Sequence, residues 1–210
     1  SLYRKGGALK KEVSVGHTFF LEDYELEPGD FISYFARATD TEGVTGAQVS
    51  TTDIYFIEVR PFDKEYRQSQ QGMGGGGGGG ANDARALSLR QRQIVAATFK
   101  LIRDKREYSA REYAENLTTV ALMQGRLREQ VENLLRRMTN RGIAQMDSDF
   151  GKIAGSLRQA AQEMVPAEEK LVEKNPEDAL PPEQRALQHL QRAESTFNEV
   201  QVAFGGGGGG

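Results

Sequence analysis

The chain has 210 residues, of which 38% are apolar, and a net charge of −3. This length allows one or two domains, and the apolar fraction supports only a modest core. No stretch approaches the roughly 20 apolar residues of a membrane-spanning helix, and the absence of cysteine excludes disulfides, thiol catalysis and thiolate metal sites.

Charge is distributed unevenly along the chain. Residues 1–71 carry eight Lys and Arg against twelve Asp and Glu, whereas the remainder carries nineteen against eighteen. Neither part has the basic excess that a nucleic-acid-binding surface requires, so we predict no nucleic-acid partner. The chain starts at Ser1 without a signal-peptide pattern and stops within glycines, and we therefore expect it to be part of a longer protein.

Residues 1–62 show the period-two alternation and turn residues of β-structure. Three strands are predicted, within HTFFLEDYEL, DFISYFARATD and STTDIYFIEVRPF. The second strand places Ile32 and Tyr34 on one face, and the third places Ile54 and Phe56 on one face. Pro28 and Gly29 predict a tight turn, and TEGVTG predicts a hairpin loop.

The string LEPGDFISYFARATDTEG resembles the E–F corner and F strand of fibronectin type III and related immunoglobulin-like sandwiches. In those domains a tyrosine hydroxyl ties the corner to nearby backbone, whereas here Ile32 stands at that position and Tyr34 follows one pleat later. A complete sandwich needs about seven strands. The resemblance therefore implies a partial immunoglobulin-like β domain over 1–62. We expect upstream strands or a partner to cover its apolar residues, rather than helices folding back across the glycines.

Two glycine runs interrupt the chain. Residues 63–86 are predicted to be a linker that contains seven glycines at 74–80, and 205–210 form a second polyglycine linker. As flexible coil, seven glycines span roughly 15 Å. Alternatively, extended glycine strands can pack side by side and join copies of the chain.

Between 87 and 204 the apolar period is close to 3.5, which predicts an elongated antiparallel helical bundle. The strongest seam belongs to a helix over Ala110–Arg141, preceded by a capping box at Ser109 and Glu112. Its seam residues are Tyr113, Leu117, Val120, Gln124, Leu127, Val131, Leu134 and Met138. The predicted fold class is thus α+β and multidomain.

Three further helices are predicted in this region. One runs over about Leu89–Tyr108, with a capping box at Ser88 and Gln91. Another begins near Asp149 and is kinked or restarted by Pro166, because proline removes an amide from the helix. The string NPEDALPPEQ is predicted to be a loop, and Pro182 suits the first turn of a last helix.

The polar residues form no catalytic constellation. His17 and His189 have no Ser or Cys partner at a recognisable spacing and are interpreted as surface or interface residues. Residues 147–149 (DSD) and 40–42 (DTE) could hold a divalent cation, although the first group is equally natural as a helix N-cap. We predict no catalytic residue, no cofactor-binding residue, no metal site and no cofactor.

A basic stretch lies on the helix with the strongest seam. We interpret it as a solvated face paired with Glu129 and Glu132, and an acidic partner surface is the alternative. Its members are Arg126, Arg128, Arg136, Arg137 and Arg141.

Three strings in order, HTFFLEDYELEPGDFISYFARATDTEG, IYFIEVRPFDKEYRQSQQ and LSLRQRQIVAATFKLIRDK, resemble a bacterial family of large membrane-anchored envelope proteins of unknown function. In that family, membrane helices precede an immunoglobulin-like module, a long helical region and glycine- and glutamine-rich tracts. The resemblance implies a periplasmic or cell-envelope location, with membrane contact only through a segment absent from this chain.

From the lack of a site, the heptads and the linkers, we expect a non-catalytic structural or scaffolding subunit of a membrane-associated envelope assembly. It would act through protein–protein contacts, self-association among them. The alternative is a binding or regulatory module of a larger envelope enzyme whose catalytic part lies outside this chain.

Overall fold

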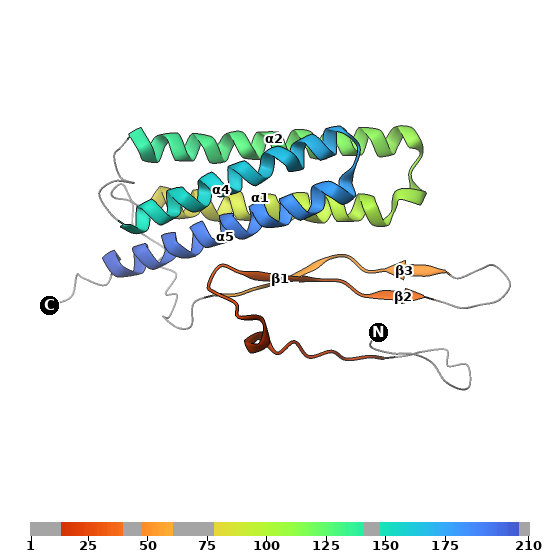
Figure 1. Ribbon diagram of the computed structural model, residues 1–210, viewed down its shortest axis with the longest axis horizontal. Helices are drawn as coiled ribbons and strands as arrows, with labels where there is room; N and C mark the ends of the chain where they lie inside the picture. The colour runs from red at the N-terminus through yellow and green to blue at the C-terminus, as the bar shows by residue number, and fades with distance from the viewer. Residues whose placement is uncertain (1–13, 40–47, 61–77, 141–147, 206–210) are drawn as a thin grey trace.

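The computed structural model describes residues 14–39, 48–60, 78–140 and 148–205. Within these residues a helical bundle and a β-ribbon lie side by side, with the ribbon running lengthwise along one flank of the bundle (Figure 1). The helices are α1 (Gly78–Arg103), α2 (Ala110–Asn140), α4 (Ser148–Val172) and α5 (Pro176–Gly205). The strands are β1 (Phe31–Tyr34), β2 (Arg37–Thr39), β3 (Val49–Thr51) and β4 (Tyr55–Glu58). The predicted α+β class is confirmed.

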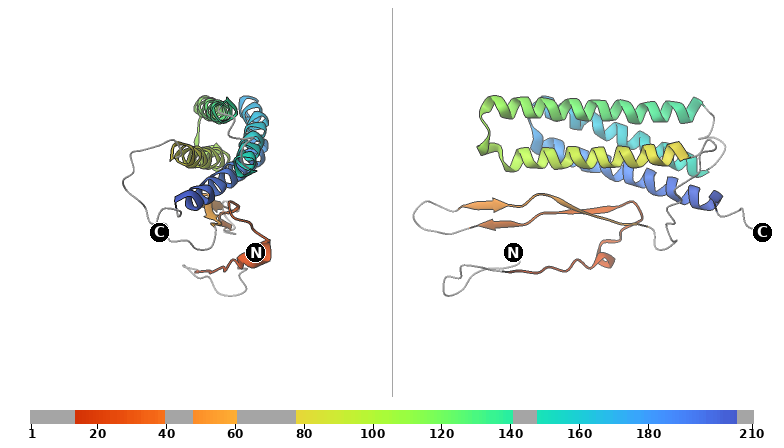
Figure 2. Two further views of the ribbon diagram at one scale, coloured as in Figure 1. Left: turned by 90° about the vertical axis from the view of Figure 1, so that its left-hand side faces the viewer. Right: turned by 180° about the vertical axis from the view of Figure 1, so that it is seen from behind.

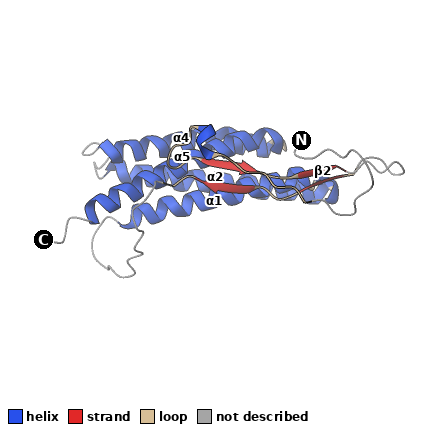
Figure 3. Ribbon diagram, turned by 90° about the horizontal axis from the view of Figure 1, so that it is seen from below, coloured by secondary structure: helices blue, strands red, loops and turns tan. Residues whose placement is uncertain are grey.

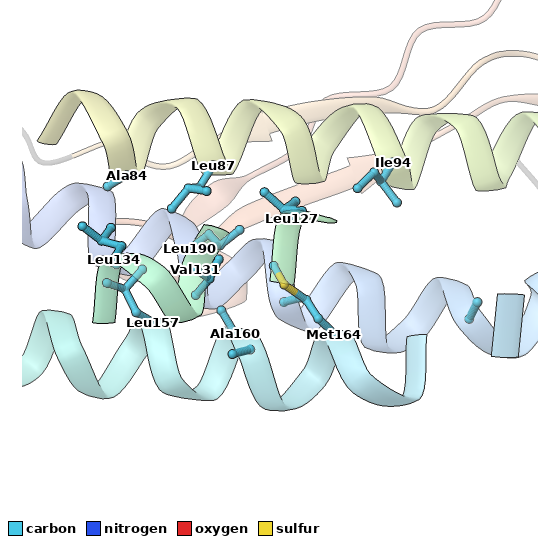
Figure 4. Close-up of a cluster of buried hydrophobic side chains, with 14 of the residues drawn as sticks. Ala84, Leu87, Ile94, Leu127, Val131, Leu134, Leu157, Ala160, Met164 and Leu190 are labelled. Carbon is cyan, nitrogen blue, oxygen red and sulfur yellow. The ribbon is translucent and has the colours of Figure 1, made fainter. Parts of the chain in front are cut away.

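The four helices enclose one apolar core. Each helix packs against the next along the chain, and α5 returns to pack against α1. The predicted seam of α2 is confirmed, since every member is buried except Tyr113, which is half-buried. Figure 4 shows seam residues Leu127, Val131 and Leu134 close to side chains of the other helices. Burying each such side chain contributes about 1.5–3 kcal/mol relative to exposure.

Helix α1 begins at Gly78, inside the range expected as linker. Ala84 and Leu87 are buried in the bundle core, and this packing outweighs the low helix propensity of glycine. The predicted capping box at Ser88 is wrong, because the Ser88 hydroxyl is buried and donates to the Ala84 carbonyl one turn earlier. The helix ends at Arg103, and the 3-10 helix η2 (Lys105–Glu107) follows.

The capping box that precedes α2 is confirmed. The backbone N–H of Ser109 donates to the Glu112 carboxylate at 3.0 Å, and the N–H of Glu112 donates to the Ser109 hydroxyl at 3.2 Å. Both N-terminal donors are therefore satisfied by side chains.

Proline breaks neither of the last two helices. Helix α4 continues through Pro166, and α5 runs from Pro176 through Pro181 and Pro182, so the predicted loop and late helix start are wrong. A proline removes the amide that would bond the carbonyl four residues earlier. For Pro166, Pro181 and Pro182 the residue four positions earlier is exposed, so water can satisfy its free carbonyl.

The second and third predicted strands form the ribbon, each broken once. Strand β1 pairs antiparallel with β4, and β2 pairs antiparallel with β3. At the break, Thr52 donates its N–H to the Ala36 carbonyl at 2.9 Å, while the Ala36 N–H donates to the Thr52 hydroxyl at 3.0 Å. The predicted hairpin is confirmed, although its loop at 40–47 lies outside the described residues.

The first predicted strand is wrong. Residues 14–20 have no regular secondary structure, and the 3-10 helix η1 (Leu21–Tyr24) follows. Glu25 then adopts a left-handed conformation with φ 49°, which ends any extended run. Period-two alternation alone does not make a strand, because a strand also needs a neighbour to accept its hydrogen bonds.

Helices α1 and α5 cover the inner face of the ribbon, contrary to the expectation of upstream strands or a partner (Figures 2 and 3). Ile54 is buried with Val95, Phe99 and Leu187, and Phe31 and Phe56 pack against this cluster. The β-ribbon thus shares its buried cluster with the helices. Helices α1 and α5 each carry apolar residues that pack in two different clusters. The sequence shows these apolar residues but does not show which segment of the chain packs against each set.

Candidate functional site

The turn before β1 is fixed to α5 by Gly29 and Asp30. Gly29 has φ 91° and approaches so closely that a Cβ there would lie 2.8 Å from the Cα of Arg192. Asp30 accepts hydrogen bonds at one oxygen from Gln188 at 3.0 Å and from Arg192 at 3.0 and 2.9 Å. Its other oxygen accepts the N–H of Glu27 at 3.0 Å.

These bonds decide the ionisation of Asp30. Burial acts to raise the pKa of Asp30, but the hydrogen bonds from Gln188, Glu27 and Arg192 and the charge of Arg192 outweigh it and leave the pKa below the usual value. The carboxylate is therefore charged at neutral pH and paired with Arg192.

Three more contacts tie the ribbon to the helices. Glu58 of β4 pairs with Arg92 of α1 at 3.4 Å, and Asp53, in the break between β3 and β4, pairs with Arg103 at the end of α1. In the middle of β1, Ser33 accepts a hydrogen bond from Gln184 of α5 at 3.2 Å. Since the ties come from the β1–β4 end of the ribbon and from the break in its middle, the inner face of this half is held against the bundle.

The outer face of the ribbon carries exposed aromatic side chains. Tyr34 and Tyr55 are opposite each other in the β1–β4 register and stack with ring centroids 5.5 Å apart. Their relative exposures are 38% and 50%, whereas Ile54 on the inner face is only 9% exposed. Phe19, from the segment before η1, contacts the ring of Tyr34 at 5.4 Å. Exposed tyrosines of this kind are typical of protein interfaces.

A group of buried polar side chains crosses three helices; we call it the polar layer and define it as Gln91, Thr98, Gln124 and Glu183. Gln91 of α1 and Gln124 of α2 exchange two hydrogen bonds of 3.0 Å. Gln91 also donates to the backbone carbonyl of Glu183 at 3.2 Å, and the Thr98 hydroxyl donates to a Glu183 carboxyl oxygen at 2.7 Å. All four members are fully buried.

The histidines lie on different elements. His17 is exposed and stacks edge-on against Phe19, with ring centroids 4.6 Å apart. His189 is half-buried in α5, where burial, with Arg192 and Arg185, lowers its pKa.

The structure describes only part of the two acidic groups that were considered as metal ligands. Residues 40–42 and Asp147 lie outside the described residues. Ser148 begins α4, and Asp149 pairs with Lys152 at 2.7 Å. In the described ranges no three His, Asp or Glu side chains gather as metal ligands would.

The arginines of α2 mostly bond within the chain. Arg128 bridges Glu132 and Glu168 at 3.0 and 3.1 Å and is partly buried. Arg137 pairs with Asp83 of α1 at 3.0 Å. Arg126 and Arg136 are exposed, and 141 lies outside the described residues. The interpretation of these arginines as a solvated face paired with Glu129 and Glu132 is confirmed for one pair, Arg128 with Glu132.

Sequence reasoning missed Asp30 and Glu183. Glu183 lies four and seven residues before Leu187 and Leu190. A charged residue in line with apolar residues at that spacing was the available signal for a buried carboxyl. Asp30 ends a turn sequence and gave no signal of its arginine, which lies far along the chain.

Comparison with known proteins gives a family but no characterised relative. None of the described helices is long and apolar enough to cross a membrane. No curated protein matches the chain, and no solved structure matches it. Residues 39–209 match the family described as a domain of unknown function, DUF4175. This match covers well over half of the sequence, and the chain therefore belongs to the DUF4175 family.

Proposed function

We propose that this protein is a non-catalytic structural subunit of a membrane-associated envelope assembly, and that it holds protein partners through the outer face of its β-ribbon. The observation that carries the proposal is the pair of exposed, stacked tyrosines Tyr34 and Tyr55 on a ribbon whose opposite face is fixed to the helices. A fixed aromatic surface loses little conformational entropy when a partner covers it.

The ribbon edges support the same proposal. In the described part of the chain, β1 pairs only with β4 and β2 only with β3. The outer edge of each strand thus offers backbone donors and acceptors to an added strand. Strands added at these edges would also extend the β-structure of residues 1–62 toward the immunoglobulin-like sandwich that their sequence resembles.

Site-specific photo-crosslinking in bacterial cells that produce the protein tests the proposal. A photoreactive amino acid replaces Tyr55 in one variant and Leu122 in the control. Leu122 is an exposed apolar residue of α2, the helix on the far side of the bundle from the ribbon (Figure 1). We expect a discrete adduct with one envelope protein from position 55 and none from position 122.

The partner found in this way allows a quantitative test. Tyr55→Ser should weaken binding of the purified partner by about tenfold or more, as truncation of an interface hot spot does, whereas Leu122→Ser should leave binding unchanged. Equal adducts from both positions would contradict the proposal. An adduct with an enzyme whose turnover changes on binding would instead favour a regulatory module.

A further inference from the structure

Glu183 is a buried carboxyl group that is only half satisfied. Its side chain is fully buried where α5 packs against α1. Thr98 donates to Oε1 at 2.7 Å, and Oε2 has no hydrogen-bond partner among the described residues. An ionised carboxylate in this position would leave a charged oxygen away from water and unpaired, which is strongly unfavourable.

Among the described residues, no positive charge compensates Glu183. Three arginines of the surrounding helices pair with other carboxylates: Arg92 of α1 with Glu58, Arg128 of α2 with Glu132 and Glu168, and Arg185 of α5 with Glu163. Burial raises the pKa of Glu183 to about 8, opposed only by the hydrogen bond from Thr98. The neutral acid is therefore the form that fits the packed bundle.

The position of Glu183 connects two interfaces. Leu180 and Leu187, one turn before and one turn after it, pack in the cluster beneath the ribbon. The next residue, Gln184, donates to Ser33 of β1. The segment of α5 that holds Glu183 against α1 is thus the segment on which the ribbon rests.

We propose that Glu183 is a proton-operated latch: the protonated side chain holds α5 against α1 and keeps the ribbon docked, and loss of its proton loosens both contacts. This inference does not depend on the proposed function. It assigns to the fold a regulatory input, the local proton concentration.

The direction follows from proton linkage. The opened state ionises near the ordinary pKa of 4.5, whereas the closed state ionises at about 8. The stabilisation of the closed state by protonated Glu183 is fully present below the ordinary pKa and is lost as the pH rises to the pKa of the closed state. Between these values the opening equilibrium should increase about tenfold per pH unit, and it should level off above about pH 8.

Amide hydrogen exchange of the whole chain measures this opening. After correction for the intrinsic exchange rate, protection of amides in 92–99 and 54–58 should fall about tenfold per pH unit from pH 6 to 8. In Glu183→Gln, which keeps the shape without the charge, protection should not vary with pH in this range. Glu199→Gln, at an exposed position of the same helix, should behave like the wild type.

Two further measurements cover the case in which Glu183→Gln does not fold. Infrared spectroscopy of the wild type should show the band of a protonated buried carboxyl at pH 7 and its loss near pH 8. Thr98→Val removes the hydrogen bond that favours the ionised form, so the loss should move to higher pH. No protonated carboxyl at pH 7, or a shift to lower pH in Thr98→Val, would overturn the proposal.

Discussion

Replacing Gly29 by alanine tests how the ribbon is fixed to α5. Gly29 has φ 91°, a conformation that an L-residue adopts only with strain, and its Cβ would lie 2.8 Å from the Cα of Arg192. A backbone atom cannot rotate away as a side chain can, so the turn must shift from the helix. The strain alone costs roughly 1–2 kcal/mol.

The shift also affects Asp30, the residue that follows. Its hydrogen bonds with Arg192 are 3.0 and 2.9 Å long and would stretch as the turn moves. Hydrogen bonds to charged groups contribute about 1.5–3 kcal/mol each, and partial loss adds to the strain. We therefore expect Gly29→Ala to destabilise the docked ribbon by roughly 2–4 kcal/mol.

The same substitution at two other glycines provides matched controls. At Gly155, within α4, an added Cβ meets nothing within 4 Å, so alanine should stabilise the helix by about 0.5–1 kcal/mol. At Gly125 the nearest atom is the carboxylate Oε1 of Glu168 at 2.6 Å, which is the end of a flexible side chain. The change in stability caused by Gly125→Ala should therefore lie between those caused by Gly29→Ala and Gly155→Ala.

Two assays separate ribbon undocking from global unfolding. Amide hydrogen exchange of 54–58 reports the docking of the ribbon, and urea denaturation followed by circular dichroism reports the stability of the bundle. Gly29→Ala should reduce ribbon protection strongly and bundle stability less. Equal changes of ribbon protection in Gly29→Ala and Gly155→Ala would show that the close approach of Gly29 to α5 does not fix the ribbon.

The other predictions concern the core, the Asp30 contact and the ribbon alone. Leu127→Ala should cost about 2–5 kcal/mol in urea denaturation because Leu127 is buried between helices, whereas the exposed Leu122→Ala should change stability by less than about 0.5 kcal/mol. The pKa of Asp30 is lowered in the fold, so its stabilisation is present above the unfolded pKa and lost as pH falls through the folded value. Ribbon protection should therefore decrease below about pH 4, and Asp30→Asn should abolish this dependence. Residues 1–71 expressed alone should lack a cooperative unfolding transition, since the ribbon's inner face is covered by helices that this segment lacks.

Local sequence signals predicted the elements that depend on local interactions. The heptad pattern of α2 predicted its bounds to within one residue and seven of its nine buried residues, and the spacing of Ser109 and Glu112 predicted its cap. Both signals act within one helix, where a side chain meets residues three or four positions away. The hairpin was predicted for the same reason, because its strands are adjacent along the chain.

Features that depend on distant segments were not predicted. The start of α1 at Gly78 depends on burial of Ala84 and Leu87 against other helices, and the cover of Ile54 depends on α1 and α5. The Asp30–Arg192 contact joins residues 162 positions apart. A single sequence records the residue types at both ends of such contacts but not their pairing.

The lengthwise placement of the ribbon has a mechanical consequence. The ribbon runs lengthwise along the helices (Figure 3). Its ties to them are spaced along its length, with Asp30 and Glu58 at the β1–β4 end and Asp53 at the break between β3 and β4. Asp53 and Glu58 are five residues apart, or about 17 Å in extended chain. A pull along the ribbon would load these ties together in shear, whereas a pull perpendicular to it would peel them one after another. Because rupture under force follows the unfolding rate, the module should resist axial tension far better than lateral tension.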